Sequence, residues 1–271
     1  MARKALFLDI DGTLVTDDKK IPPENDRALQ RALQLGHCVI ISTGRPLASA
    51  LLLAQELGLT GKGSYLISFN GGILYDTYNK KVIFKLPVPM DCVKALFAEA
   101  GRRGIHIQTY DDDRVVVEKR CDDEETRLYC SKIRMDYRVV DSIDELEQEP
   151  VKLLAINMND IKPLEDFKAW IEENLGDRIN AFFSNYQYLE IVSKGLSKGN
   201  ALRQLAGILG VPISDTVAAG DQANDIDMVA AAGTGCAMIN GTDEIKKIAD
   251  YVTTRDNNHA GVAEIIERFI L

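Results

Sequence analysis

The apolar run Ala5-Leu6-Phe7-Leu8 near the start of the chain ends directly in Asp9-Ile10-Asp11-Gly12-Thr13. A short, uninterrupted apolar run is typical of a buried strand in a parallel sheet, where both faces are covered. Asp9 and Asp11 then stand where open α/β sheets bind ligands, beyond the carboxyl end of a strand. Two carboxylates there are costly to bury without a cation, and a hard ion such as Mg²⁺ suits them. A polar turn is the alternative explanation, because Asp and Gly are common in turns.

Three further apolar runs end in polar residues, and helical patterns lie between them. The expected strands are 37–42, 65–69 and 216–219, which end at Thr43, Asn70 and Gly220-Asp221. Helices are expected over 23–35, from 46 to about 57, and over 197–209, with Pro or Ser at the start and Gly at the end. Strands that alternate with helices through short joints predict an α/β fold with a parallel sheet.

The pattern changes at about Leu86, where Pro87 and Pro89 flank a hinge-like joint. The strands become shorter and more polar, which predicts a second, smaller α+β domain inserted into the first. We expect the core over 1–83 and 189–271 and the inserted domain over 84–188. The elements expected in the insertion are helices at 91–103, 122–131 and 163–174 and strands at 105–110, 114–118, 151–158, 179–184 and 188–192.

Composition limits the function. The 271 residues carry a net charge of −9, which disfavours a nucleic-acid binder but permits an anionic small molecule. The five cysteines are odd in number and form no Cys-x-x-Cys, which indicates reduced thiols in a cytoplasmic protein. We find no signal peptide and no apolar run of about 18 residues, so no membrane span is expected. The three histidines are scattered and predict no zinc cluster, and nothing indicates an oligomeric state.

Four sets of polar residues are predicted to lie at the same edge of the sheet, because all carboxyl ends of parallel strands lie at one edge. They are Asp9 with Asp11; Thr43 with Arg45; Lys198; and Asp221 with Asn224 and Asp225. A carboxylate can attack a phosphoryl group, and a second carboxyl can protonate the leaving oxygen and then activate water. A hydroxyl with N–H groups at a helix start, a lysine and a divalent ion can hold the phosphoryl charge.

These residues resemble the four motifs of the haloacid dehalogenase-like phosphohydrolases, in the family's order. The Cof-type branch is the most similar, and it carries a large α/β cap of the C2B type between the second and third motifs. The matching segments are Asp9-x-Asp11-Gly12-Thr13, Thr43-Gly44-Arg45, Asn70-Gly71, Ser197-Lys198-Gly199 and Gly220-Asp221-x-x-Asn224-Asp225. The resemblance implies a Rossmann-like core with the cap as the inserted domain.

The resemblance also implies a role for each matching residue. Asp9 would be the nucleophile and a Mg²⁺ ligand, and Asp11 the general acid/base that lends its backbone carbonyl to the metal. Lys198 would order nucleophile and phosphate, and Asp221 would bind the metal directly. Asn224 and Asp225 would supply the remaining contacts, to phosphate or to a metal-bound water. The residues implied to bind substrate are Thr43, Gly44, Arg45, Asn70, Gly71 and Asn224, and those implied to bind metal are Asp9, Asp11, Asp221 and Asp225.

The function implied is a Mg²⁺-dependent phosphatase of small phosphorylated metabolites that works through an aspartyl phosphate, with the cap closing over the site. A phosphotransferase or mutase would form the same intermediate and pass the phosphoryl group to another hydroxyl. The same residues would also suit a phospho-acceptor signalling module, and the fold by itself would permit a non-catalytic binding protein. Sugar phosphates, flavin mononucleotide, pyridoxal phosphate and nucleotides all stay open as substrates.

Several other charged or aromatic residues are expected to have no role in catalysis or metal binding. Asp111-Asp112-Asp113 is expected to be a solvated turn, and the acidic run Asp122–Glu125 the start of a helix, rather than cation sites. Lys194 is expected to be a solvated lysine, Trp170 to lie in the core of the cap, and His259 to take no part in the reaction.

Overall fold

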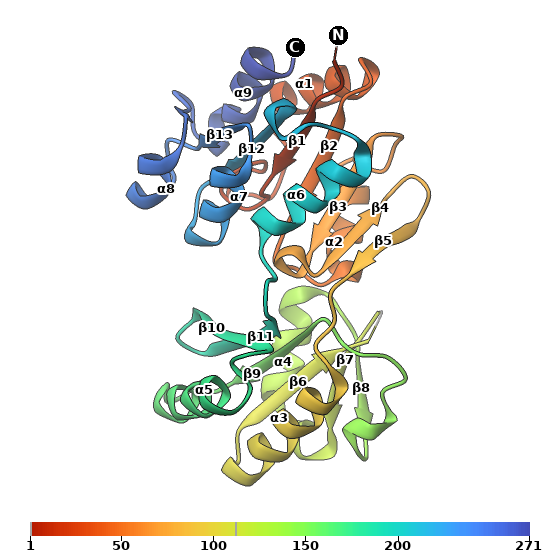
Figure 1. Ribbon diagram of the computed structural model, residues 1–271, viewed down its shortest axis with the longest axis vertical. Coiled ribbons are helices and arrows are strands. Elements are labelled where there is room, and N and C mark those ends of the chain that lie inside the picture. Colours follow the sequence, from red (N-terminus) through yellow and green to blue (C-terminus); the bar gives the residue numbers. More distant parts are fainter. Residues whose placement is uncertain (1, 112) are drawn as a thin grey trace. The chain divides into compact units, whose positions relative to one another are not determined.

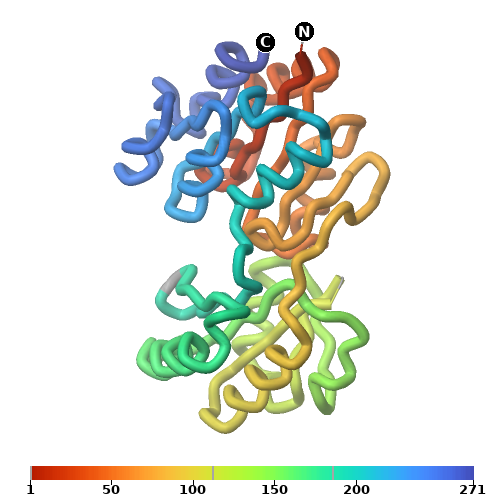
Figure 2. Tube along the Cα trace, in the orientation of Figure 1, coloured from red at the N-terminus to blue at the C-terminus, as the bar shows by residue number. Residues whose placement is uncertain are grey.

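The computed structural model describes residues 2–111 and 113–271, so Asp112 of the predicted acidic turn lies outside the described residues. The chain forms two compact units. The first contains the residues up to Arg45, Ala50–Phe84 and Ser197–Leu271; the second contains Pro46–Ser49 and Lys85–Leu196. The chain enters the second unit at the end of β5 and returns to the first just before α6 (Figures 1 and 2).

The first unit is built on an eight-stranded sheet in the order β14-β13-β12-β1-β2-β3-β4-β5. β1 (Ala5–Leu8) lies between β12 (Thr216–Gly220) and β2 (Cys38–Ser42) and is parallel to both. The remaining strands are β3 (Ser64–Ser68), β4 (Ile73–Asp76), β5 (Lys81–Lys85), β13 (Thr234–Ala237) and β14 (Tyr251–Val252). All residues of β1 and β2 are buried, as the continuous apolar runs predict.

Helices cover this sheet. α6 (Lys198–Leu209) and α7 (Ile226–Ala231) lie in front of the strands in Figure 1, and their apolar faces pack with Phe7, Ile40 and Ala218. Ser197 is the N-cap of α6, and its side chain accepts a hydrogen bond from the Asn200 N–H. This cap fixes where the helix begins and thereby places Lys198 at its first position. The other helices are α1 (Pro23–Gln34), α2 (Leu47–Glu56), α8 (Asp243–Ile248) and α9 (Gly261–Phe269).

The second unit has a six-stranded sheet in the order β10-β11-β9-β6-β7-β8. Its neighbouring strands are antiparallel except for the parallel pair of β7 and β8. The strands are β6 (His106–Tyr110), β7 (Val115–Glu118), β8 (Tyr137–Val140), β9 (Lys152–Ile156), β10 (Ile179–Asn185) and β11 (Tyr188–Ser193). The helices are α3 (Met90–Arg103), α4 (Glu124–Ile133) and α5 (Lys162–Leu175), and α3 and α5 share one apolar core with the sheet.

The structure differs from the predicted organisation at two places. The expected boundary at 188/189 is wrong, because Leu189 pairs with Ala155 of β9 and the whole of β11 belongs to the second sheet. The first unit resumes only at Ser197. Strand β8 is absent from the predicted elements; it is a short edge strand with only Val140 buried, so its sequence lacks an apolar run.

Smaller predictions about the second unit and the thiols agree with the structure. Trp170 packs against the core of the second unit and stacks on Phe167 with ring centroids 6.1 Å apart. All five cysteines are buried free thiols. Among the helices of residues 2–111 and 113–271, none has the length and apolar character that a membrane crossing requires.

Candidate functional site

Lys198 connects two carboxylates that are distant in sequence. Its Nζ lies 2.6 Å from Asp9 Oδ1 and 2.6 Å from Asp225 Oδ1, and its side chain is fully buried. Asp9 follows β1, while Asp225 ends a short turn, Ala223–Asp225, that follows β12. The parallel pairing of β1 with β12 brings their carboxyl ends together, as predicted from the strand pattern.

Burial is the largest influence on the pKa values of Asp9 and Lys198. It raises the pKa of Asp9 to about 7, although the charge of Lys198 acts in the opposite direction. Burial alone would lower the pKa of Lys198, but Asp9 and Asp225 outweigh it and raise that pKa. The lysine therefore stays charged between its two acceptors. One ammonium cannot neutralise several buried carboxylates, so the group favours a further cation.

Asp221 completes an acidic cluster with Asp9 and Asp225, in which one oxygen of each residue lies within 4.8 Å of the others. Thr13 Oγ1 donates to Asp221 Oδ1 at 2.9 Å, and burial raises the pKa of Asp221. Gly12 has a φ of +82°, and a Cβ at this position would collide with the Asp221 carboxylate. The backbone thus makes room for a carboxylate-lined space whose all-oxygen donors fit a hard divalent ion such as Mg²⁺.

The contacts of Asp225 separate it from its two acidic neighbours. Its Oδ2 accepts hydrogen bonds from the backbone N–H groups of Asp221 and Gln222, at 3.1 and 3.2 Å. Its Oδ1 is bonded to Lys198. Protein donors thus engage both oxygens, which favours a positioning role over the predicted role as a metal ligand. Asn224 is exposed on the same turn, and its predicted contact with substrate stays a prediction.

Asp11 lies in a more open position and is paired with two cations. Lys19 Nζ lies 2.7 Å from Asp11 Oδ1, and Arg45 Nη2 lies 3.0 Å from Asp11 Oδ2. Burial pushes the pKa of Asp11 upward, but Lys19 and Arg45 outweigh it and lower that pKa. Arg45, predicted to face the substrate, is thus bound to the predicted acid/base. Lys19 is absent from the predicted set, because a lysine in a polar loop carries no pattern.

The segment that follows β2 at Thr43 and the segment that follows β3 at Asn70 are joined by backbone hydrogen bonds. The Asn70 N–H donates to the Thr43 carbonyl at 3.0 Å, and Thr43 Oγ1 accepts from the Arg45 N–H at 3.2 Å. Asn70 has a left-handed φ of 55°, and a Cβ on Gly44 would lie 3.1 Å from its amide. Gly71, at φ +115°, passes so close to the Ser197 carbonyl that a side chain would collide with it. Strained backbone of this kind is found at ligand sites, which agrees with the predicted role of this segment in binding substrate.

The chain is similar to known proteins over almost its whole length. Residues 6–266 match the family of haloacid dehalogenase-like hydrolases. The Streptococcus pyogenes serotype M6 protein M6_Spy0533 is 33% identical over 273 residues, covering 100% of both chains. The pyridoxal phosphate phosphatase YbhA of Escherichia coli is 32% identical over 273 residues, covering 98% of each chain. The crystal structure of a haloacid dehalogenase-like hydrolase from Bacteroides thetaiotaomicron superposes with a TM-score of 0.89 at 31% identity, covering 98% of this chain and 99% of that chain.

Proposed function

We propose that this chain, which belongs to the haloacid dehalogenase-like hydrolases, is a Mg²⁺-dependent phosphatase that acts on small phosphorylated metabolites through an aspartyl phosphate. The observation that carries the proposal is the buried Asp9, bonded to Lys198 at 2.6 Å and grouped with Asp221. A carboxylate fixed in this way has one oxygen held by the lysine and a second oxygen available to attack phosphorus.

Asp9 and Asp11 divide the chemistry in this proposal. The free Asp9 oxygen forms a bond to phosphorus while the ester P–O bond breaks, and Asp11 donates a proton to the leaving oxygen. Water then attacks the phosphorus, Asp11 takes a proton from it, and the bond between phosphorus and Asp9 breaks. The pairs with Lys19 and Arg45 hold Asp11 ionised, which suits the second step. The Asp11 side chain is 43% exposed, so it can leave Lys19 and Arg45 and carry the proton that the first step needs.

The remaining residues orient the nucleophile and offset the negative charge of the phosphoryl group. Lys198 keeps Asp9 oriented and offsets negative charge on the phosphoryl oxygens. The Thr43 hydroxyl and the N–H groups beside it would bind the same oxygens. Asp9, Asp221 and the backbone carbonyl of Asp11 would hold the Mg²⁺, which supplies charge neutralisation for the phosphoryl group when bound.

The substrate class is proposed from the relatives and from the charge of the site. The E. coli relative is named for pyridoxal phosphate, a small phosphorylated metabolite. The chain's net charge of −9 makes a polyanionic nucleic acid a poor substrate.

The decisive experiment is a phosphate-release screen over sugar phosphates, flavin mononucleotide, pyridoxal phosphate and nucleotides, with and without Mg²⁺. We expect at least one compound to release inorganic phosphate only with Mg²⁺, and no release by the Asp9→Asn variant. Formation of an isomeric phosphate ester without free phosphate would instead identify a mutase. A stable acyl phosphate that outlives the assay would identify a signalling module.

A further inference from the structure

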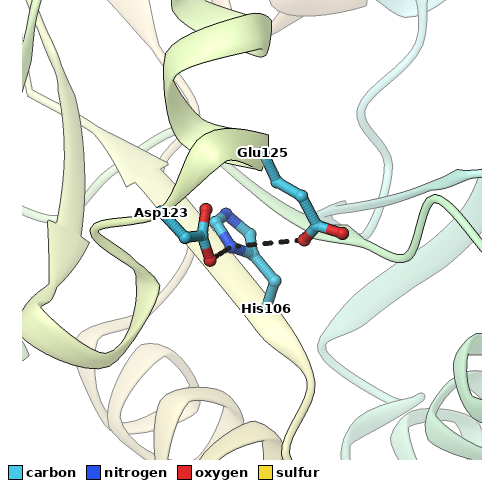
Figure 3. A group of neighbouring side chains, drawn as sticks. All are labelled: His106, Asp123 and Glu125. Carbon is cyan, nitrogen blue, oxygen red and sulfur yellow. Dashed lines mark hydrogen bonds and ion pairs between the residues drawn. The ribbon is translucent and has the colours of Figure 1, made fainter.

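A second group of potential metal ligands lies in the second unit, away from the proposed reaction. His106 begins β6, Asp123 is the N-cap of α4, and Glu125 lies in the first turn of that helix. Figure 3 shows both carboxylates directed at the same ring nitrogen. His106 Nδ1 lies 2.9 Å from Asp123 Oδ2 and 3.6 Å from Glu125 Oε2. No metal site is expected here from the sequence, because no motif places His106 next to the acidic run.

The neighbours of Nε2, the other ring nitrogen, favour one tautomer of neutral His106. Thr126 Oγ1 lies 3.5 Å from His106 Nε2, and the threonine hydroxyl already donates to the Cys121 carbonyl at 2.6 Å. A hydroxyl has one proton, so towards the imidazole this oxygen can only accept. The Gln108 Oε1 acceptor lies at the same distance of 3.5 Å. These acceptors favour a proton on Nε2, and in a neutral ring with that tautomer Nδ1 presents a lone pair to the two carboxylates.

Three acceptors then converge on one point: the Nδ1 lone pair and the two carboxylate oxygens. Such an arrangement requires a proton or a metal ion at its centre. A proton on Nδ1 would satisfy Asp123 at 2.9 Å, but the 3.6 Å to Glu125 is too long for a good hydrogen bond. Tetrahedral ligands about 2.0–2.1 Å from an ion lie roughly 3.3 Å apart, a value that falls between these two distances.

The surroundings hold the ligands in place and leave an entry path. The His106 side chain is only 5% exposed, and the second oxygen of Asp123 accepts from the Thr126 N–H at 3.0 Å. Ligands whose other atoms are hydrogen-bonded in this way are typical of metal sites. A hollow of about 650 Å³ adjoins the group, and its lining includes all three residues together with Asn157 and Asn159. The hollow gives an ion access and leaves space for water as a fourth ligand.

We propose that His106, Asp123 and Glu125 form a binding site for a divalent transition-metal ion of the Zn²⁺ type. One imidazole and two carboxylates suit such an ion, whereas Mg²⁺ prefers six oxygen ligands. The ion would tie the start of β6 to the start of α4 and so stabilise the second unit. The proposal does not depend on the phosphatase reaction, because none of its residues belongs to that site.

The competing explanation is a buried imidazolium. Burial lowers the pKa of His106, but hydrogen bonds and charges of Cys121 and Asp123 outweigh this and raise it to about 9. Protonation of Nδ1 and metal binding exclude each other, since the ligand must be deprotonated. A test must therefore detect the ion at His106 itself rather than a general effect of added metal.

The first experiment is a Zn²⁺ titration of the full-length chain in excess Mg²⁺, with Glu125→Gln and Asp123→Asn as site variants. Asn is as good an N-cap as Asp, so Asp123→Asn keeps the start of α4. Glu173→Gln is the control, because it removes the same charge from an exposed position on α5, outside the residues that line the hollow. We expect each site variant to lose Zn²⁺ affinity by at least about tenfold while the control binds as the wild type does. Equal affinity in all four proteins overturns the proposal.

The second experiment observes the imidazole nitrogens by ¹⁵N NMR, which is practical because the chain has three histidines. We expect Zn²⁺ to shift His106 Nδ1 and to leave His37 and His259 at their original positions. An unchanged His106 signal at saturating Zn²⁺ would show that the cation there is only a proton. The Asp9→Asn variant should give the same His106 shift, so failure of the phosphatase proposal would not affect this result.

Discussion

The two units each gather three ionisable residues around one point, but they neutralise the charge differently. In the first unit Asp9, Asp221 and Asp225 lie together, and the ammonium of the fully buried Lys198 side chain bonds to Asp9 and Asp225. In the second unit Asp123 and Glu125 face His106, which is a much weaker base. A lysine keeps its proton across the physiological pH range, whereas a histidine can give its proton up to a metal.

This difference separates a site that stays charged from a site that can exchange its cation. The Lys198 ammonium cannot leave, so the first cluster keeps a fixed positive charge beside the proposed nucleophile. The second cluster holds whichever cation binds best under the conditions. Three of the following predictions test the first cluster and the last concerns an ion pair of the second unit, in order of decreasing effect.

Asp9→Asn should abolish phosphate release, by at least roughly a thousandfold, because it removes the attacking oxygen's charge at nearly constant volume. Lys198 keeps its bond to Asp225, so the fold should survive. The checks are steady-state phosphate release and the thermal midpoint. Asp18→Asn, an exposed loop residue, is the control and should keep full activity. Substantial turnover by Asp9→Asn would remove Asp9 from the role of nucleophile.

Lys198→Met should destabilise the first unit strongly and also eliminate activity. The change leaves Asp9 and Asp225 buried without their counterion, and breaking a buried pair costs about 3–5 kcal/mol. Denaturant unfolding measures this loss of free energy. Lys194→Met is the matched control, since Lys194 is exposed and its Nζ donates to a backbone carbonyl, that of Gly176, at 2.8 Å. Equal stability of the two variants would mean that Lys198 is not the fixed charge of the cluster.

Asp221→Asn should raise the Mg²⁺ concentration needed for half-maximal activity by about tenfold or more, because it removes one charged oxygen ligand. Thr13 can still bond the amide oxygen, so the loop should keep its shape. A Mg²⁺ titration of phosphate release gives the answer. Asp215→Asn, at the opposite end of β12, should leave the titration unchanged. An unaltered Mg²⁺ requirement in Asp221→Asn would argue against its role as a ligand.

The first unit is readable from the sequence because its strands are buried on both faces. Continuous apolar runs such as Ala5–Leu8 and Cys38–Ser42 fix the strand positions, and a parallel sheet then brings their polar ends together. The contacts of Lys198 with Asp9 and Asp225 follow from this rule. Lys19 cannot be found in this way, since its contact with Asp11 depends on the conformation of a polar loop.

The second unit is harder to read because its outer elements bury little. β8 lies at the edge of its sheet and buries only Val140, so no apolar run marks it. β11 alternates half-buried and buried residues only at its start and is buried throughout its second half, so its pattern does not show to which unit it belongs. The group around His106 joins β6 to α4 through side chains, and no spacing rule connects a strand residue to a helix start 17 positions later.

The smallest effect expected belongs to the ion pairs that Glu99 makes near the end of α3 in the second unit. Glu99 accepts hydrogen bonds from Arg102 and Arg103, and the Arg102 bond is the main cause that lowers its pKa to about 2. A lowered carboxyl pKa stabilises the fold above the ordinary value near 4.5, and this contribution is lost as pH falls towards 2. Glu99→Gln should therefore lower the thermal midpoint slightly at neutral pH, and the difference from wild type should shrink in acid. Glu173→Gln, an exposed residue of α5, should show no such pH dependence. A constant difference at every pH would trace the effect to packing of the Glu99 side chain rather than to its charge.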